Sequence, residues 1–136
     1  MDKRRTATVL YAFVGVVEVG DFVINMMILP SSRYSQQTSE TLGGLGLEQV
    51  FARELLLVLL TAVISGLFLA TAWGFYKNTP LLKGLYRWAV GSLAVYVVFH
   101  FITAITLPAM VYAWYIGAAY GLAAAVLYVV GKVAER

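Results

Sequence analysis

The sequence predicts an all-α integral membrane protein, folded as a bundle of four transmembrane helices. Of its 136 residues, 61% are hydrophobic and 12% are charged, whereas soluble domains carry about 45–50% apolar and about 25% charged residues. A water-soluble domain of this size could not cover so many apolar side chains with so few charges. The composition therefore excludes a soluble enzyme, a nucleic-acid-binding domain and a disordered chain.

Four apolar stretches are long enough to cross the roughly 30 Å hydrocarbon core of a bilayer, which takes about 20 helical residues. We predict spans at residues 7–29, 50–75, 85–107 and 109–130. They are joined by a polar loop at 30–49, a short basic loop at 76–84 and a tight turn at Pro108. The chain is therefore expected to form one membrane domain over residues 1–136, without a separate catalytic domain.

The first stretch is expected to be a permanent span, although Lys3, Arg4 and Arg5 before it resemble the start of a signal peptide. It is too long for a signal peptide, it contains Glu18 and Asp21, and no small-residue cleavage site follows it.

The distribution of Lys and Arg predicts the orientation. Eight of the ten basic residues lie in the N-terminal segment, in the second loop with its flank, and in the C-terminal tail; Arg33 and Arg53 lie on the other side. Cytoplasmic loops carry the excess of Lys and Arg. We therefore expect both termini to face the cytoplasm, in the cytoplasmic membrane.

Polar residues on the first span predict a functional or structural centre inside the bilayer. Glu18, Asp21 and Asn25 follow one another at i, i+3 and i+7, which places them on one helical face. A charged side chain at the bilayer centre costs about 2.5–3.5 kcal/mol on insertion scales. We therefore expect at least one of the two acids to be protonated near neutrality, or to have a cationic partner.

Depth estimates at about 1.5 Å per residue bring polar residues of other spans to the level of these acids. His100 falls level with Asp21, so a pair across the bundle is predicted, which Thr61 and Ser65 could join. Arg53 and Glu54 are predicted at the outer interface, bridging to the first span near Asn25. The predicted intramembrane polar site consists of Glu18, Asp21, Asn25, Thr61, Ser65, Tyr96 and His100.

Basic residues of the second loop have a second possible role besides orientation. Lys77, Lys83 and Arg87 lie where a lipid phosphate would meet the protein. The chain has no Cys and one His, so neither a cofactor nor a metal centre is expected. Small residues every fourth position, at Ala62, Gly66 and Ala70 and at Ala113, Gly117, Gly121 and Ala125, predict close helix contacts, within the bundle or in a homo-oligomer.

Several segments resemble the GtrA-like family of small four-span proteins, which help to move polyprenyl-phosphate-linked sugars across membranes. The first span, from Phe13-Val14-Gly15-Val16-Val17 through Asp21-Phe22, is similar to that family's opening helix, and Trp73-Gly74-Phe75 is similar to the end of its second helix. The resemblance implies an isoprenoid phosphate bound by Lys77, Lys83 and Arg87. The polar face of the first span would then be a hydrated path for the sugar.

Two other classes remain open at this point. Glu18 would also suit a small proton- or ion-coupled transporter or channel that works as an oligomer, and the small-residue stripes would suit an accessory subunit of a larger membrane complex. No sequence motif points to catalysis. An integral-membrane isomerase with Glu18, Asp21 and His100 as acid and base is the enzymatic alternative.

Overall fold

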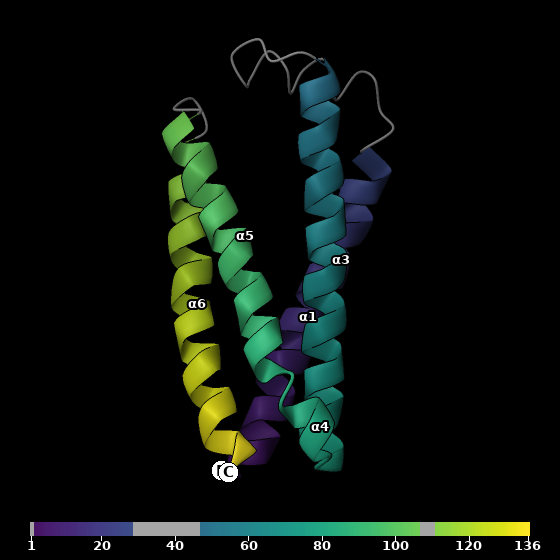
Figure 1. The fold of residues 1–136 in the computed structure, drawn as a ribbon, viewed down its shortest axis with the longest axis vertical. Helices are drawn as coiled ribbons and strands as arrows, with labels where there is room; N and C mark the ends of the chain where they lie inside the picture. The colour runs from purple at the N-terminus through teal and green to yellow at the C-terminus, as the bar shows by residue number, and fades with distance from the viewer. Residues whose placement is uncertain (1, 29–46, 107–110) are drawn as a thin grey trace.

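The computed structural model describes residues 2–28, 47–106 and 111–136, and nearly all of them are helical (Figure 1). The helices are α1 (Lys3–Ile28), α3 (Leu47–Lys77), α4 (Pro80–Lys83), α5 (Tyr86–Thr106) and α6 (Tyr112–Glu135). Four helical segments are long and apolar enough to cross a membrane, and the third of them runs from Pro80 through α4 and α5 to Thr106. The predicted all-helical fold with four candidate spans is confirmed.

The helix ends differ from the predicted ones in the connecting segments. The helix labelled α3 in Figure 1 begins at Leu47 and ends at Lys77. Helix α6 continues to Glu135, beyond the predicted end at residue 130. The predicted basic loop at 76–84 contains the short helix α4. Its first residue is Pro80, whose fixed φ suits the first turn of a helix. The turn at Pro108 and most of the polar loop at 30–49 lie outside the described residues.

A tight turn after α3 folds α4 back onto it. Asn78 adopts a φ of 55°, and the backbone N–H of Thr79 donates to the carbonyl of Gly74 at 2.9 Å. This is the Schellman type of helix end, in which Asn is tolerated in the left-handed conformation. A Cβ atom at Gly74 would lie 2.6 Å from the backbone carbon of Leu82, so this close approach requires glycine.

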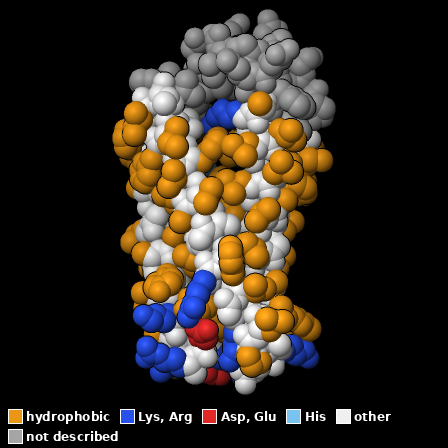
Figure 2. Space-filling view, viewed as in Figure 1, with side chains coloured by type: hydrophobic (Ala, Val, Ile, Leu, Met, Phe, Trp, Pro, Cys, Tyr) orange, Lys and Arg blue, Asp and Glu red, His pale blue; other side chains and the backbone are white. Residues whose placement is uncertain are grey.

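The long helices form two pairs. The first pair is α1 with α3 and the second is α5 with α6; packing within each pair is more extensive than the α3–α5 and α1–α6 packing between the pairs. The start of α1 and the end of α6 lie at the same end of the bundle, close to α4 (Figure 1). Figure 2 shows apolar side chains along the length of the bundle and most of the basic ones at that end.

Aromatic residues lock the two pairs together near this end. Tyr11 of α1 is fully buried, and its hydroxyl donates to the backbone carbonyl of Leu127 in α6 at 2.7 Å. Its ring lies 5.2 Å from the ring of Phe68 and 5.5 Å from that of Phe75, both in α3. Tyr11 therefore contacts both helical pairs at once.

The two small-residue stripes have different neighbours. A Cβ atom at Gly117 would lie 3.0 Å from the ring of Phe101 and one at Gly121 would lie 3.7 Å from Val97, so the stripe on α6 packs on α5. A Cβ atom at Gly66 would meet no described atom within 4 Å. The two stripes therefore do not pack against each other: the one on α6 lies against α5, and Gly66 of α3 is exposed.

Candidate functional site: an intramembrane polar cluster and a basic pocket

Glu18 lies at the centre of the polar cluster, on the side of α1 that faces the other helices. Its exposed fraction is 0%. Neither carboxylate oxygen has a hydrogen-bond partner among the residues that the structure describes. Nearly all buried polar side chains in native proteins are hydrogen-bonded, so an orphaned carboxyl group calls for an explanation.

Asp21 lies one turn further along α1 and contacts α6. The hydroxyl of Tyr120 donates to Oδ2 of Asp21 over a long 3.4 Å. The Tyr120 hydroxyl is also close enough to Glu18 to interact with that carboxyl group, while its hydrogen bond is to Asp21. Its ring meets that of Tyr96 in α5 edge-on, with centroids 5.1 Å apart. The two tyrosines thus connect the acids of α1 to both helices of the second pair.

His100 is held by its own helix. Its Nδ1 lies 2.9 Å from the backbone carbonyl of Tyr96, and because a carbonyl oxygen only accepts, Nδ1 must carry the proton. The predicted partner Asp21 is near enough to interact electrostatically, but no hydrogen bond or ion pair joins the two side chains in the described ranges. Asp21 instead has Tyr120 as its hydrogen-bonding partner.

The hydroxyl groups predicted to join this site bond within α3. Thr61 donates to the carbonyl groups of Leu57 and Val58 at 2.9 and 3.0 Å. Ser65 donates to the carbonyl of Ala62 at 2.9 Å. Both residues are buried, but neither donates its proton to the acids of α1. Asn25 is half-buried on α1.

Arg53 and Glu54 form a buried ion pair near the start of α3. An Arg53 guanidinium nitrogen lies 3.0 Å from Oε1 of Glu54, and the guanidinium carbon lies 5.1 Å from the ring centre of Phe99 in α5. Among the described residues, no hydrogen bond or ion pair joins this pair to α1, and Arg53 makes a cation–π contact with α5. Arg53 therefore pairs with Glu54 and contacts the ring of Phe99.

The three basic residues of the second loop each contact a different part of the protein. Lys83 donates to the side-chain oxygen of Asn78 at 2.8 Å. Lys77 lies over the rings of Trp73 and Tyr76. Arg87 lies 3.7 Å from a carboxylate oxygen of Glu135 at the end of α6. Of these three predicted phosphate ligands, Lys83 alone lines the basic pocket described next.

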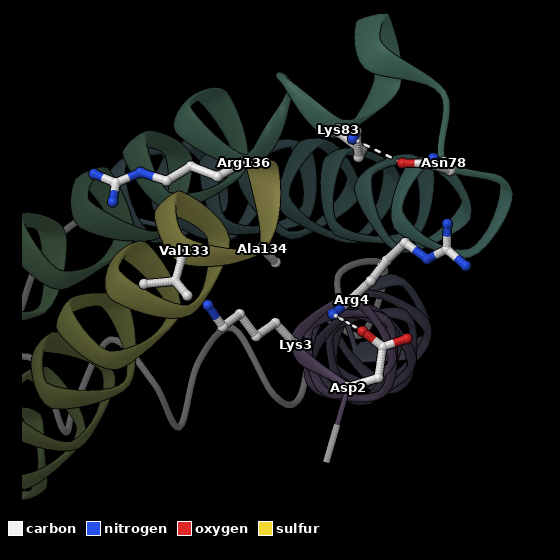
Figure 3. A pocket seen from close by; sticks show the side chains of 8 residues that line it. All are labelled: Asp2, Lys3, Arg4, Asn78, Lys83, Val133, Ala134 and Arg136. Atoms are coloured by element: carbon white, nitrogen blue, oxygen red, sulfur yellow. Dashed lines mark hydrogen bonds between the residues drawn. The ribbon is translucent and has the colours of Figure 1, made fainter.

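A basic pocket of about 530 Å³ lies at the end of the bundle that carries both chain termini (Figure 3). In Figure 3, Lys3 reaches toward Val133 of α6, Arg4 extends from α1 on another side, and Arg136 points away from both. The signal for this pocket in the sequence is the number of spans, because four spans bring the two basic termini to one side. The lining residues are Asp2, Lys3, Arg4, Asn78, Lys83, Val133, Ala134 and Arg136.

Two hollows follow the seam between α1 and α6. The lower hollow, of about 220 Å³, shares Lys3 and Val133 with the basic pocket and is otherwise lined by Thr6, Val129 and Val130. The upper hollow, of about 250 Å³, ends at Glu18 and Tyr120. Its remaining lining residues are Phe13, Val14, Val17, Ala119 and Ala123. The seam thus connects an apolar surface to the orphaned carboxyl group.

No protein-family model, curated protein or solved structure matches this chain. The resemblance to the GtrA-like family therefore stays a prediction from sequence motifs. Within the described ranges, no three His, Asp or Glu side chains lie close enough together to hold a metal ion. Function has to be inferred from the arrangement of the side chains themselves.

Proposed function

We propose that this protein binds, and helps to translocate, a membrane lipid that carries a phosphate group on a long apolar chain, of the polyprenyl-phosphate class. The observation that carries the proposal is the position of the basic pocket, which shares Lys3 and Val133 with the lower hollow of the α1–α6 seam. A site that is cationic at the membrane surface and apolar just below it fits such a lipid.

The charges of the pocket suit a phosphate. Lys3 and Arg4 come from the first turn of α1, and Lys83 comes from the end of α4. Asp2 is the acid in the lining, and its Oδ1 accepts the backbone N–H of Arg4 at 3.1 Å, which occupies it at the start of the helix. Each Lys or Arg near an anionic membrane surface contributes about 1 kcal/mol of attraction. We place this end at the cytoplasmic face, where the excess of basic residues belongs.

The seam supplies a surface for the chain of the lipid. Valine side chains line the lower hollow, and alanine and valine side chains line most of the upper one. Fifteen residues separate Lys3 from Glu18 along α1, which is a rise of about 22 Å. An isoprenoid chain would follow this seam from the basic pocket, and the polar cluster near Glu18 would help a sugar head group to cross the apolar layer.

Lipid binding to the protein in nanodiscs tests this proposal. With polyprenyl phosphate added to a neutral phospholipid bilayer, we expect a combined Lys3→Ala, Arg4→Ala and Lys83→Ala variant to lose at least about tenfold in affinity, because about 1 kcal/mol per basic residue is removed. Native mass spectrometry of the protein–lipid complex provides the measurement. The matched control is Lys132→Ala, which removes an exposed basic residue of α6 that does not line the pocket.

Two further lipids identify what the site recognises. Phosphatidic acid carries a phosphate but no isoprenoid chain, and an uncharged polyprenol carries the chain but no phosphate. The proposal expects polyprenyl phosphate to bind more tightly than either. Equal affinity of the triple variant and the Lys132→Ala control for polyprenyl phosphate would refute it.

A further inference from the structure

We infer that the upper hollow of the α1–α6 seam is a separate binding site for a lipophilic organic cation, with Glu18 as its counter-ion. The lipid proposal places an isoprenoid chain in the same hollow, but this inference has its own test, because the basic pocket supplies none of the residues that line the upper hollow. The hollow opens toward the membrane-facing surface, where Phe13 is 67% and Val17 is 41% exposed, and it ends at Glu18, which is fully buried. A ligand would therefore reach the carboxyl group from the side of the bundle.

Glu18 has no cationic partner among the described residues, and the hydroxyl of Tyr120 is the polar group that approaches it from α6. Both of its oxygens are buried without a hydrogen bond to any described residue. The two ion pairs found in the described part of the chain, Arg53–Glu54 and Arg87–Glu135, do not include it. An isolated ionised carboxylate is strongly disfavoured in an apolar environment. Because no described residue supplies a positive charge to Glu18, the carboxyl group needs either a proton or a bound cation.

The described groups that interact with Glu18 are acidic or aromatic. Asp21 of α1, Tyr120 of α6 and Tyr96 of α5 all interact electrostatically with it, and none of them is a cation. His100 of α5 faces Asp21, and Arg53 of α3 interacts with His100 and Tyr96 while it is paired with Glu54. The described residues around this site are therefore two acids and two tyrosines. A bound ligand would supply the positive charge that pairs with Glu18.

The lining of the upper hollow determines which class of cation would fit there. Apart from Glu18 and Tyr120, the hollow is lined by Phe, Val and Ala side chains. Ca²⁺ and Mg²⁺ take six or more oxygen ligands, and the side chains of this lining offer only the carboxyl group of Glu18 and the hydroxyl of Tyr120. An organic ammonium ion with apolar substituents fits, because the substituents contact the apolar wall and the charge lies between a carboxylate and aromatic rings.

The exchange balances in charge and protons. Before the ligand arrives, the buried carboxyl group of Glu18 holds its proton. When the cation enters, the O–H bond of Glu18 breaks, the proton leaves for the aqueous phase, and the carboxylate pairs with the cation. No covalent bond forms to the ligand. Cation binding should therefore compete with protons and become tighter as the pH rises.

Calorimetric titration with benzyltrimethylammonium tests the inference on the full chain in nanodiscs. This probe has a permanent charge, so any pH dependence arises from the protein. Neopentylbenzene has the same shape without the charge and serves as the matched ligand. We expect the cation to bind at least tenfold more tightly than neopentylbenzene at pH 8, and to lose this advantage at pH 5.

Variants assign the effect to Glu18. Glu18→Gln should lower the affinity for the cation at least tenfold and leave that for neopentylbenzene unchanged, whereas Glu18→Asp should keep a pH-dependent preference for the cation. Glu135→Gln, which removes a distant carboxyl group, should behave as the parent chain. If Glu18→Gln fails to fold, the parent protein still decides: equal affinity for cation and isostere at pH 8 overturns the inference. Equal cation binding by Glu18→Gln and the parent chain also overturns it.

Discussion

Replacement of Gly131 by valine is expected to destabilise the bundle by about 3 kcal/mol, the upper part of the usual cost of overpacking a core. A Cβ atom at this position would lie 2.5 Å from the hydroxyl of Tyr11 and 2.6 Å from the ring of Tyr86. Both tyrosines are almost completely buried. Tyr11 cannot withdraw without losing its hydrogen bond to Leu127 and its ring contacts with Phe68 and Phe75.

The measurement is unfolding of the protein in mixed micelles by titration with sodium dodecyl sulfate, followed by tryptophan fluorescence. Gly66→Val is the matched control, because it makes the same change inside a helix where a Cβ atom would meet nothing within 4 Å. The difference between the two variants isolates the cost of the clash from the helix propensity of valine. Similar stabilities of the two variants would show that Gly131 does not support the contact between α1 and α6.

Replacement of Glu18 by methionine is expected to stabilise the bundle by about 1–3 kcal/mol, because it removes a buried polar group that has no hydrogen bond. Methionine is close to glutamate in length and fills the same space without a charge. Active sites often retain residues that reduce stability. The same variant should lose the preference for benzyltrimethylammonium over neopentylbenzene, so stability and cation binding should change in opposite directions.

Glu54→Met provides the matched comparison and should have the opposite sign. Glu54 is buried and lies 3.0 Å from the guanidinium of Arg53, so its removal leaves Arg53 largely buried without its counter-ion. Loss of one partner from a buried ion pair costs about 3–5 kcal/mol. Thermal unfolding of both variants in the same detergent measures the difference. A Glu18→Met protein that is less stable than the parent would mean that the carboxyl group is held by favourable interactions.

The sequence predicted the helices better than their contacts. Hydropathy located four candidate spans, and the spacing of Glu18 and Asp21 placed both acids on one side of α1. Counting residues along each span also brought Tyr96 of α5 level with Glu18 and His100 level with Asp21, and each of these two pairs interacts electrostatically. These predictions succeeded because the rise and periodicity of a helix depend little on its neighbours.

The partners of the polar residues could not be predicted, because they depend on rotamers and on which helices pair. Tyr120 was absent from the predicted site, although it is the residue that hydrogen-bonds Asp21. Lys3 and Arg4 were assigned to orientation alone, since their approach to Lys83 depends on how α4 folds back after Asn78. The local sequence signal for that turn is Asn78 followed by Thr79-Pro80, because Asn tolerates the left-handed conformation and Pro suits the first turn of a helix.

The hydroxyl groups of Thr61, Thr71 and Thr103 each donate to a carbonyl of the preceding turn of the same helix. Each of these hydroxyl groups is therefore hydrogen-bonded within its own helix, and none of these hydrogen bonds joins one helix to another. At these positions the helices are held together by the packing of their surfaces. A threonine-to-valine exchange preserves the shape of the side chain, so it should change the stability of the bundle very little at all three positions. At these three positions the packing therefore depends on the volume of the side chain and not on its polarity.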